Sequence, residues 1–202
     1  MRSADIGVAS TRVGQSGSVR KGLALARQLK QSFPDDTLLN EYWLPTIRAA
    51  VQLSDGNPSR ALASLEVVTR YELATPRLPN PVPLYPAYLR GTAYLALGSP
   101  ERARAEFQKV LDHPGLIGNG LIGAVAHLGL GRAYAAETAT GTQVHTTNAH
   151  RDDRQGSQRT DALAKSQAAY NDFFAIWKDA DPNIPLLVEA RKEAHKLQQQ
   201  WR

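Results

Sequence analysis

The sequence predicts an all-α protein in which pairs of helices pack against one another as a repeat. Aromatic residues make up only 7% of the 202 residues, and Ala and Leu carry most of the apolar content. This composition is typical of packed helices and not of sheets. Apolar residues also recur at three- and four-residue steps along most of the chain. The motif Gly91-Thr92-Ala93-Tyr94 returns about forty residues later as Gly131-Arg132-Ala133-Tyr134.

The N-terminal part of the chain predicts a leader followed by three helices. Residues 1–18 are rich in Gly and Ser without a sustained period, so we expect them to be disordered. Apolar periodicity begins directly after them. A second helix is expected over about 37–53, and Pro45 inside it should kink or split it. Asn57-Pro58 predicts the start of a third helix, because an N-cap residue precedes a proline at the first helical position.

The middle of the chain contains five prolines between Thr75 and Pro86. We interpret this segment as an extended connection within one domain, since helical periodicity resumes at once over 84–97. Ser99-Pro100 then opens a fifth helix with the same combination of cap residue and proline. Pro114 is expected to mark the end of that helix.

The C-terminal part predicts three more helices and one long loop. A helix is expected over about 120–137, followed by a polar segment at 138–159 that shows no periodicity and is interpreted as a mobile loop. A further helix over 161–178 and a final helix complete the chain. The folded domain is therefore expected over 19–202, with about seven to eight helices.

The composition excludes several classes of site. The chain has no cysteine, which rules out disulfides, zinc–thiolate sites and cysteine nucleophiles. It shows neither the apolar stretch of a membrane span nor the apolar core of a secretory signal. The sequence therefore leaves the cellular compartment undetermined. The cytoplasm is the default, and an extracytoplasmic location is possible if the chain is part of a longer, membrane-anchored protein. The net charge of +5 is spread among acidic residues, which argues against a nucleic-acid footprint.

No catalytic, cofactor or metal site is predicted. The segment from Gly118 to Gly123 matches a Gly-x-Gly-x-x-Gly pattern, but no strand precedes it, so we interpret it as a turn between helices. His145 and His150 lie in the polar segment near two aspartates. Metal ligands are normally held on rigid elements, so these histidines are interpreted as solvated. No serine, histidine and acid are placed as a catalytic triad would require.

The repeated motif resembles the tetratricopeptide repeat. Gly91, Tyr94, Ala103 and Phe107 match its small and aromatic positions. In that arrangement a small residue lets two antiparallel helices approach closely, and the aromatic residues fill the space beside it. A weaker copy covers 43–71, where small residues recur but a glutamine takes the place of the tyrosine. The resemblance implies a helical solenoid in which the first helix of each pair lines a concave face.

That concave face is the predicted binding groove for a protein or peptide partner. The side chains expected on it are Trp43, Thr46, Tyr85, Tyr88, Thr92 and Arg132. Trp, Tyr and Arg are the residue types that most often anchor protein interfaces. The alternative is that some of these side chains only pack against the neighbouring repeat. The expected function is a non-catalytic protein-interaction module without a cofactor.

A second resemblance covers most of the chain after the leader. The segments that carry it are Phe33 to Thr37, Tyr42 to Ala49, Glu106 to Lys109 and Trp177 to Pro182. They resemble the C-terminal helical-repeat region of acidobacterial-type proteins that begin with a eukaryotic-like serine/threonine kinase domain or a winged-helix domain. The resemblance implies a regulatory or sensory region of a bacterial signalling protein. Kinase activity does not carry over, because the kinase motifs are absent from this chain.

One function of a different class stays open beside this one. An accessory domain of a transcription regulator could bind nucleic acid electrostatically through the basic residues. Steep salt dependence of retention on DNA or RNA would distinguish it from a protein-binding module.

Overall fold

The computed structural model describes residues 12–73, 84–118, 120–140 and 149–199. Every regular element within these ranges is helical, which confirms the all-α prediction. The chain forms two compact units, Met1–Ala74 and Thr75–Arg202. The boundary between them coincides with the start of the proline-rich segment. Residues 74–83, which include most of that segment, lie outside the described residues.

In residues 12–73, the described part of the first unit, there are three α-helices and two short helical turns. They are α1 (Arg12–Ser32), the π-helical turn η1 (Leu39–Trp43), α2 (Leu44–Ser54), α3 (Pro58–Leu65) and the 3₁₀ turn η2 (Val67–Tyr71). The helix α1 starts at Arg12, within the predicted leader. Its glycines lower helix propensity, but no proline interrupts the stretch. Residues 1–11 of the predicted leader lie outside the described residues.

Pro45 divides the second predicted helix, as expected. The backbone is π-helical up to Trp43 and α-helical from Leu44, with the proline in the first turn of α2. A proline ring cannot accommodate the preceding turn of a regular α-helix, so the change of helix type relieves that clash.

The helices α2 and α3 pack through small side chains. Ala49 and Ala61 are fully buried, and so is Leu65 on the same side of α3. Gln52, which stands where the repeat would have tyrosine, accepts a hydrogen bond of 2.8 Å from Ser64. A hydrogen bond thus replaces aromatic packing between these two helices.

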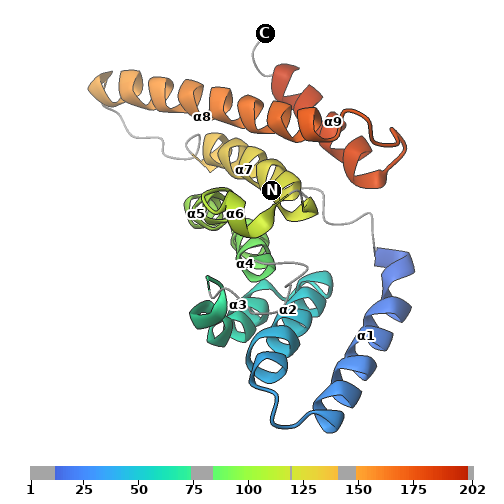
Figure 1. Ribbon diagram of the computed structural model, residues 1–202. Helices are drawn as coiled ribbons and strands as arrows, with labels where there is room; N and C mark the ends of the chain where they lie inside the picture. Colours follow the sequence, from blue (N-terminus) through green and yellow to red (C-terminus); the bar gives the residue numbers. More distant parts are fainter. Residues whose placement is uncertain (1–11, 74–83, 119, 141–148, 200–202) are drawn as a thin grey trace. The chain divides into compact units, whose positions relative to one another are not determined.

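The described residues of the second unit form six helices, which are labelled in Figure 1. They are α4 (Tyr85–Ala96), α5 (Pro100–Leu111), α6 (Pro114–Ile117), α7 (Leu121–Thr140), α8 (Ala149–Ile176) and α9 (Pro185–Gln199). The helix α7 contacts α4, α5 and α8. Its sequence is apolar on nearly all sides, which suits a helix surrounded by others.

The prediction of a polar loop at 138–159 is corrected by the structure. The helix α7 continues to Thr140 and α8 already begins at Ala149, so most of that segment is helical. The prediction relied on missing apolar periodicity. A helix needs an apolar stripe only where it is covered, and residues 156–160 of α8 are exposed. Residues 141–148 lie outside the described residues.

Phe107 holds three helices of the second unit together. A Cβ atom added at Gly91 of α4, or at Gly129 of α7, would lie 2.6 Å from its ring. Both helix backbones therefore lie directly against the ring of this α5 residue. The ring is 1% exposed, and Ala103 one turn earlier is fully buried.

The contact between α7 and α8 uses the same kind of packing. A Cβ atom at Gly131 would lie 2.8 Å from the ring of Tyr170. The hydroxyl of Ser166 is fully buried and donates a 2.7 Å hydrogen bond to the carbonyl of Gly131. Ser166 and Tyr170 are four residues apart, as are Ala103 and Phe107, so each pair presents one small and one aromatic side chain to the facing helix.

None of the helices described is both long and apolar enough to cross a bilayer.

Candidate functional site

Three of the predicted groove residues lie together on one side of α4. Tyr85, Tyr88 and Thr92 follow one another at three- and four-residue steps, and each is half-buried. The rings of Tyr85 and Tyr88 stack with their centroids 6.0 Å apart and their planes at 16°. The hydroxyl of Thr92 donates a 3.0 Å hydrogen bond to the carbonyl of Tyr88. We call these three residues the tyrosine face.

The tyrosine face is anchored to the core from behind. The ring of Tyr88 lies 5.8 Å from that of Phe107. Tyr85 packs against the cluster that contains Leu84 and Val125. Burial raises the pKa of the Tyr85 phenol, and the neighbouring Tyr88 adds to the effect. The two rings therefore have a fixed position while part of each remains accessible, which suits a preformed contact surface.

Leu84, directly before α4, adopts an unusual backbone conformation. Its φ of 60° is left-handed, although its side chain is fully buried. For a residue with a branched side chain this costs on the order of 1–2 kcal/mol. Burial of the leucine side chain offsets that cost and sets the direction in which α4 begins.

Arg132 of α7 is held by the last helix. Its guanidinium donates two hydrogen bonds to the carboxylate of Glu193 on α9, with N–O distances of 2.9 and 3.0 Å. The hydroxyl of Tyr170 on α8 donates to the same carboxylate at 2.8 Å. Burial lowers the pKa of Arg132, but the hydrogen bond and the charge of Glu193 outweigh it and raise the pKa overall.

These contacts change the role of Arg132. Its side chain is 29% exposed and its donors point into an ion pair within the fold. Its first role is to join α7 to α9, and a partner would have to compete with Glu193 for it. Tyr88 of the tyrosine face contributes to the electrostatic surroundings of Arg132, so the two lie near each other.

Glu193 and Tyr170 are not among the predicted site residues. A signal was available for the first of them. Glu193 lies on the apolar stripe of α9, three residues after Ala190 and four before Leu197. A carboxylate at such a position requires a cationic partner, because an unpaired buried charge is costly.

The remaining two predicted groove residues lie in the first unit. Trp43 ends η1 and is half-buried, with its ring edge-on to Tyr42 at 5.0 Å. Thr46 is only 2% exposed, and its hydroxyl donates to the carbonyl of Tyr42 within its own helical segment. The prediction of Thr46 as a groove residue is therefore wrong: its side chain belongs to the core.

Arginine–carboxylate pairs connect the helices of the second unit. Arg90 of α4 reaches Glu106 of α5 at 2.8 Å, and Arg104 of α5 reaches Glu137 of α7 at 3.1 Å. The guanidinium of Arg104 also lies 5.6 Å from the ring centroid of Tyr134. Together with the Arg132–Glu193 pair, these contacts link α4, α5, α7 and α9.

Within the part of the chain that the structure describes, the other candidate motifs do not form a site. Gly118 has a φ of 50° at the end of α6, which fits the interpretation of the Gly-rich motif as a turn. His145 lies outside the described residues, and the side chain of His150 is not among those described. His127 of α7 faces Asp172 of α8 at 3.5 Å. No cluster of three or more potential metal ligands occurs among the described side chains.

Comparisons with protein-family models, with curated proteins and with solved structures found no match to this chain.

Proposed function

We propose that this protein is a non-catalytic protein-interaction module and that the tyrosine face of α4 contacts the partner. The observation that carries the proposal is the stacked, half-buried pair of Tyr85 and Tyr88 on a face fixed by Phe107. Tyrosine combines a large contact area with few rotatable bonds, so a rigid pair loses little conformational entropy on binding. The same face can take an extended or a helical peptide.

The proposal includes a tetratricopeptide-like repeat as the architecture. Its support is the recurrence of one packing element: an aromatic ring against a glycine in α4/α5 and in α7/α8, with alanines in α2/α3. In a stack of this kind the first helices of successive pairs share one side. The sequence resemblance described above supports a regulatory role in a bacterial signalling protein.

Nucleic-acid binding through the second unit is less well supported. Arg90, Arg104 and Arg132 each pair with a carboxylate from another helix. Cations used in this way hold the fold together and offer less charge to phosphates.

The first test is photo-crosslinking in cells of the source organism. A photoreactive amino acid replaces Tyr88 on the tyrosine face, and in a matched strain it replaces Ala168, which is exposed on α8. A defined protein captured from position 88 and not from position 168 is the expected result. Equal capture from both positions, or none from either, contradicts a specific contact at α4.

The second test measures affinity with the captured partner. Thr92→Arg adds bulk to the tyrosine face without removing a packed side chain, and Ala168→Arg adds the same group to α8. We expect Thr92→Arg to raise Kd by roughly tenfold or more, which corresponds to a loss of about 1.4 kcal/mol in binding free energy. Arg132→Glu is unsuitable here, because it places two carboxylates together and would disturb the fold. If the Kd of Thr92→Arg is unchanged, like that of Ala168→Arg, the tyrosine face is not the contact surface for the partner.

A further inference from the structure

The helix α1 is an exception to the mixing of basic and acidic residues along the chain, since its own formal charge is +5. Its 21 residues include no Asp or Glu. Its basic residues are Arg12, Arg20, Lys21, Arg27 and Lys30. The chain has 24 basic and 19 acidic residues, so without these five the basic and acidic residues are equal in number. A helix of this kind differs from a solvated surface helix, which normally alternates charges of both signs.

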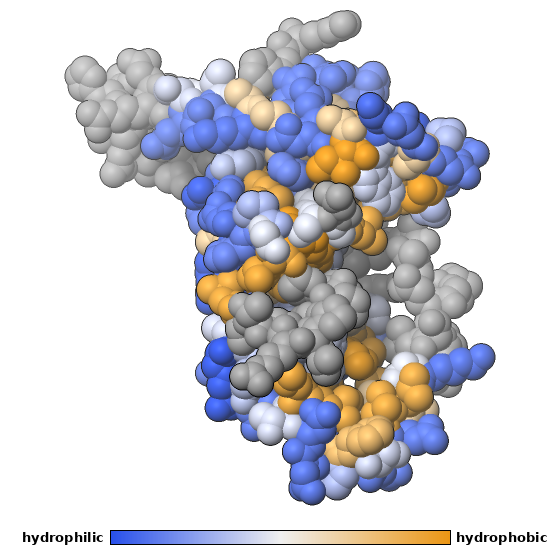
Figure 2. Space-filling view, viewed as in Figure 1, coloured by the Kyte–Doolittle hydropathy of each residue, from blue (hydrophilic) through white to orange (hydrophobic). Residues whose placement is uncertain are grey.

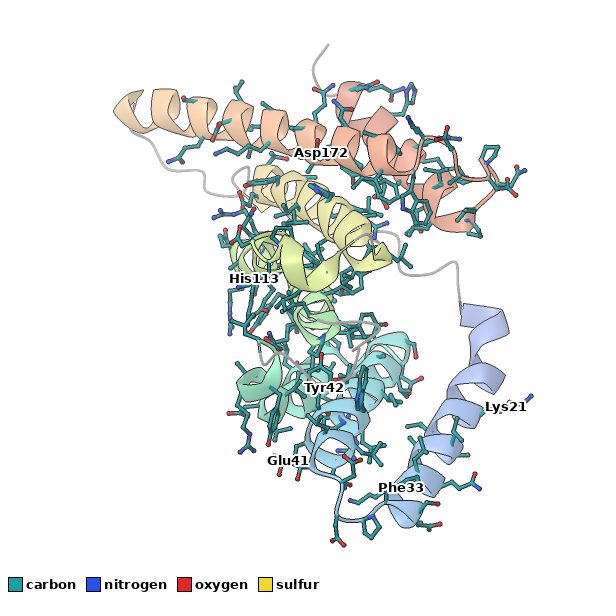
Figure 3. The ribbon with its side chains drawn as sticks, viewed as in Figure 1. Lys21, Phe33, Glu41, Tyr42, His113 and Asp172 are labelled. Carbon is teal, nitrogen blue, oxygen red and sulfur yellow. The ribbon has the colours of Figure 1, made fainter. Side chains whose placement is uncertain are left out.

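The exposed cations of α1 have no acidic partner among the described residues. Lys21, Arg27 and Lys30 are exposed, and no ion pair between described side chains includes them. Lys21 extends from α1 away from α2 (Figure 3). Glu41 of η1 is engaged elsewhere, since it accepts a hydrogen bond from Tyr71 and pairs with Arg70 at 3.3 Å. The positive charges of Lys21, Arg27 and Lys30 are therefore open to an external anion.

The same helix also exposes a large apolar side chain beside Lys21. Ala26 is buried, and Leu23 and Leu29 are half-buried, so this side of α1 serves the fold. Leu25 is 57% exposed and lies one turn after Lys21, on the same side of the helix. Phe33, directly after α1, is 55% exposed. Figure 2 shows hydrophilic and hydrophobic surface side by side in this part of the molecule.

We propose that α1 docks on an anionic membrane surface. Phosphates alone would engage the lysines and arginines but would leave Leu25 without a favourable contact. The boundary between headgroups and acyl chains accommodates both, because a helix lying in that plane pairs its cations with lipid phosphates and places its apolar side chains below them. The binding is peripheral and reversible. It involves the first unit only, so it is separate from the tyrosine face and from the function proposed above.

The experiment is vesicle flotation of the full chain at low and at physiological salt. Phosphatidylcholine vesicles are compared with vesicles that also contain phosphatidylglycerol. The expected result is flotation with the anionic vesicles only, weakening as salt rises because surface charges are screened. Equal flotation with both vesicle types, or with neither at low salt, overturns the proposal.

A pair of matched variants locates the contact. Neutralising Lys21, Arg27 and Lys30 to Gln should lower the partition coefficient on the order of 100-fold, given three cations near an anionic surface. The control neutralises Arg191, Lys192 and Lys196, three exposed cations of α9, and changes the net charge by the same amount. An equal loss in the control means that net charge alone drives binding and overturns the assignment to α1.

Two further measurements separate the remaining outcomes. Leu25→Gln should weaken partitioning by roughly tenfold while the far-ultraviolet circular dichroism stays unchanged. Unaltered partitioning in this variant argues against apolar insertion and overturns the proposed geometry. Retention of mixed-sequence duplex DNA at physiological salt through the same cations, without vesicle binding, would make α1 a nucleic-acid contact instead.

Discussion

At the scale of single residues, the tightest geometry lies around Phe107. Its ring touches the backbones of two helices at Gly91 and Gly129, so there is no room for a methyl group at either position. Glycine costs helix stability, roughly 0.5–1 kcal/mol relative to alanine in a helix interior. The close approach of three helices around one buried ring compensates for that cost, and this explains glycine in the middle of α4 and α7.

This packing predicts the outcome of glycine-to-alanine substitutions. Gly91→Ala and Gly129→Ala should each destabilise the second unit by about 1–3 kcal/mol, because the new methyl group forces the ring of Phe107 to shift. The free energy of unfolding is measured by urea denaturation. Gly156→Ala on α8 is the control, since no atom lies within 4 Å of its added Cβ. We expect that variant to be neutral or more stable, and destabilisation of all three to the same degree would contradict the packing argument.

The raised pKa of Tyr170 predicts that the second unit becomes less stable at alkaline pH. Burial raises the pKa of Tyr170 well above its ordinary value, and the charge and hydrogen bond of Glu193 raise it further. Below a pH of about 10 the phenol is protonated in both the folded and unfolded chain. Above it the unfolded chain releases the proton first, so stability should fall by up to about 1.4 kcal/mol per pH unit.

Urea denaturation at a series of alkaline pH values measures this effect. Tyr170→Phe is the control: it loses the hydrogen bond to Glu193 and is less stable at neutral pH, yet its stability should fall less steeply above pH 10. The pKa of Tyr85 is also raised, so part of the slope should remain. Identical slopes in the two proteins would show that Tyr170 is not the group responsible.

At the scale of helices, the proline signals located the helix starts correctly. Asn57-Pro58 and Ser99-Pro100 each precede a helix, as predicted. The structure adds that neither cap side chain hydrogen-bonds to the helix backbone. The start is therefore set by the proline, which fixes φ and lacks an N–H group that would be left unpaired.

The missing cap bond leads to a prediction for α5. Ser99→Ala should change the free energy of unfolding by less than about 0.5 kcal/mol, where a bonded cap residue typically contributes about 1 kcal/mol. Pro100→Ala should cost about 1 kcal/mol, because the unfolded chain gains conformational freedom. Thermal unfolding of both variants tests this. A larger loss in Ser99→Ala than in Pro100→Ala would reverse the assignment.

At the scale of the whole molecule, the two units differ in the size of their cores. Of the buried apolar residues that the structure describes, seven lie in the first unit and 21 in the second. The seven in the first unit are Ala26, Tyr42, Leu44, Ala49, Ala61, Leu65 and Val68. Small cores leave a narrow margin over the conformational entropy of the chain.

The two units should therefore unfold differently. A fragment of residues 75–202 is expected to unfold cooperatively at the urea concentration of the main transition in the full chain. A fragment of residues 1–74 is expected to unfold at lower urea, with a shallow transition. Circular dichroism of the two fragments and of the full chain measures this. A disordered 75–202 fragment would mean that its core requires the first unit.

The sequence by itself determined most of the helices and the close packing of Phe107. These features depend on local signals: apolar spacing, prolines at helix starts, and small residues four or fewer positions from an aromatic one. The tyrosine face could also be predicted from the sequence, because Tyr85, Tyr88 and Thr92 share one side of a single helix. Such relations hold whatever the rest of the chain does.

The tertiary structure alone decided how the helix faces combine. Arg132 meets Glu193 from 61 residues away, and that contact turns a predicted groove residue into a link between α7 and α9. The side chain of Thr46 is buried because its side of α2 packs into the core of the first unit. The polar start of α8 is helical although its sequence shows no apolar stripe. Each of these depends on which surfaces are brought together, and the free energy of that choice is shared among residues far apart in the sequence.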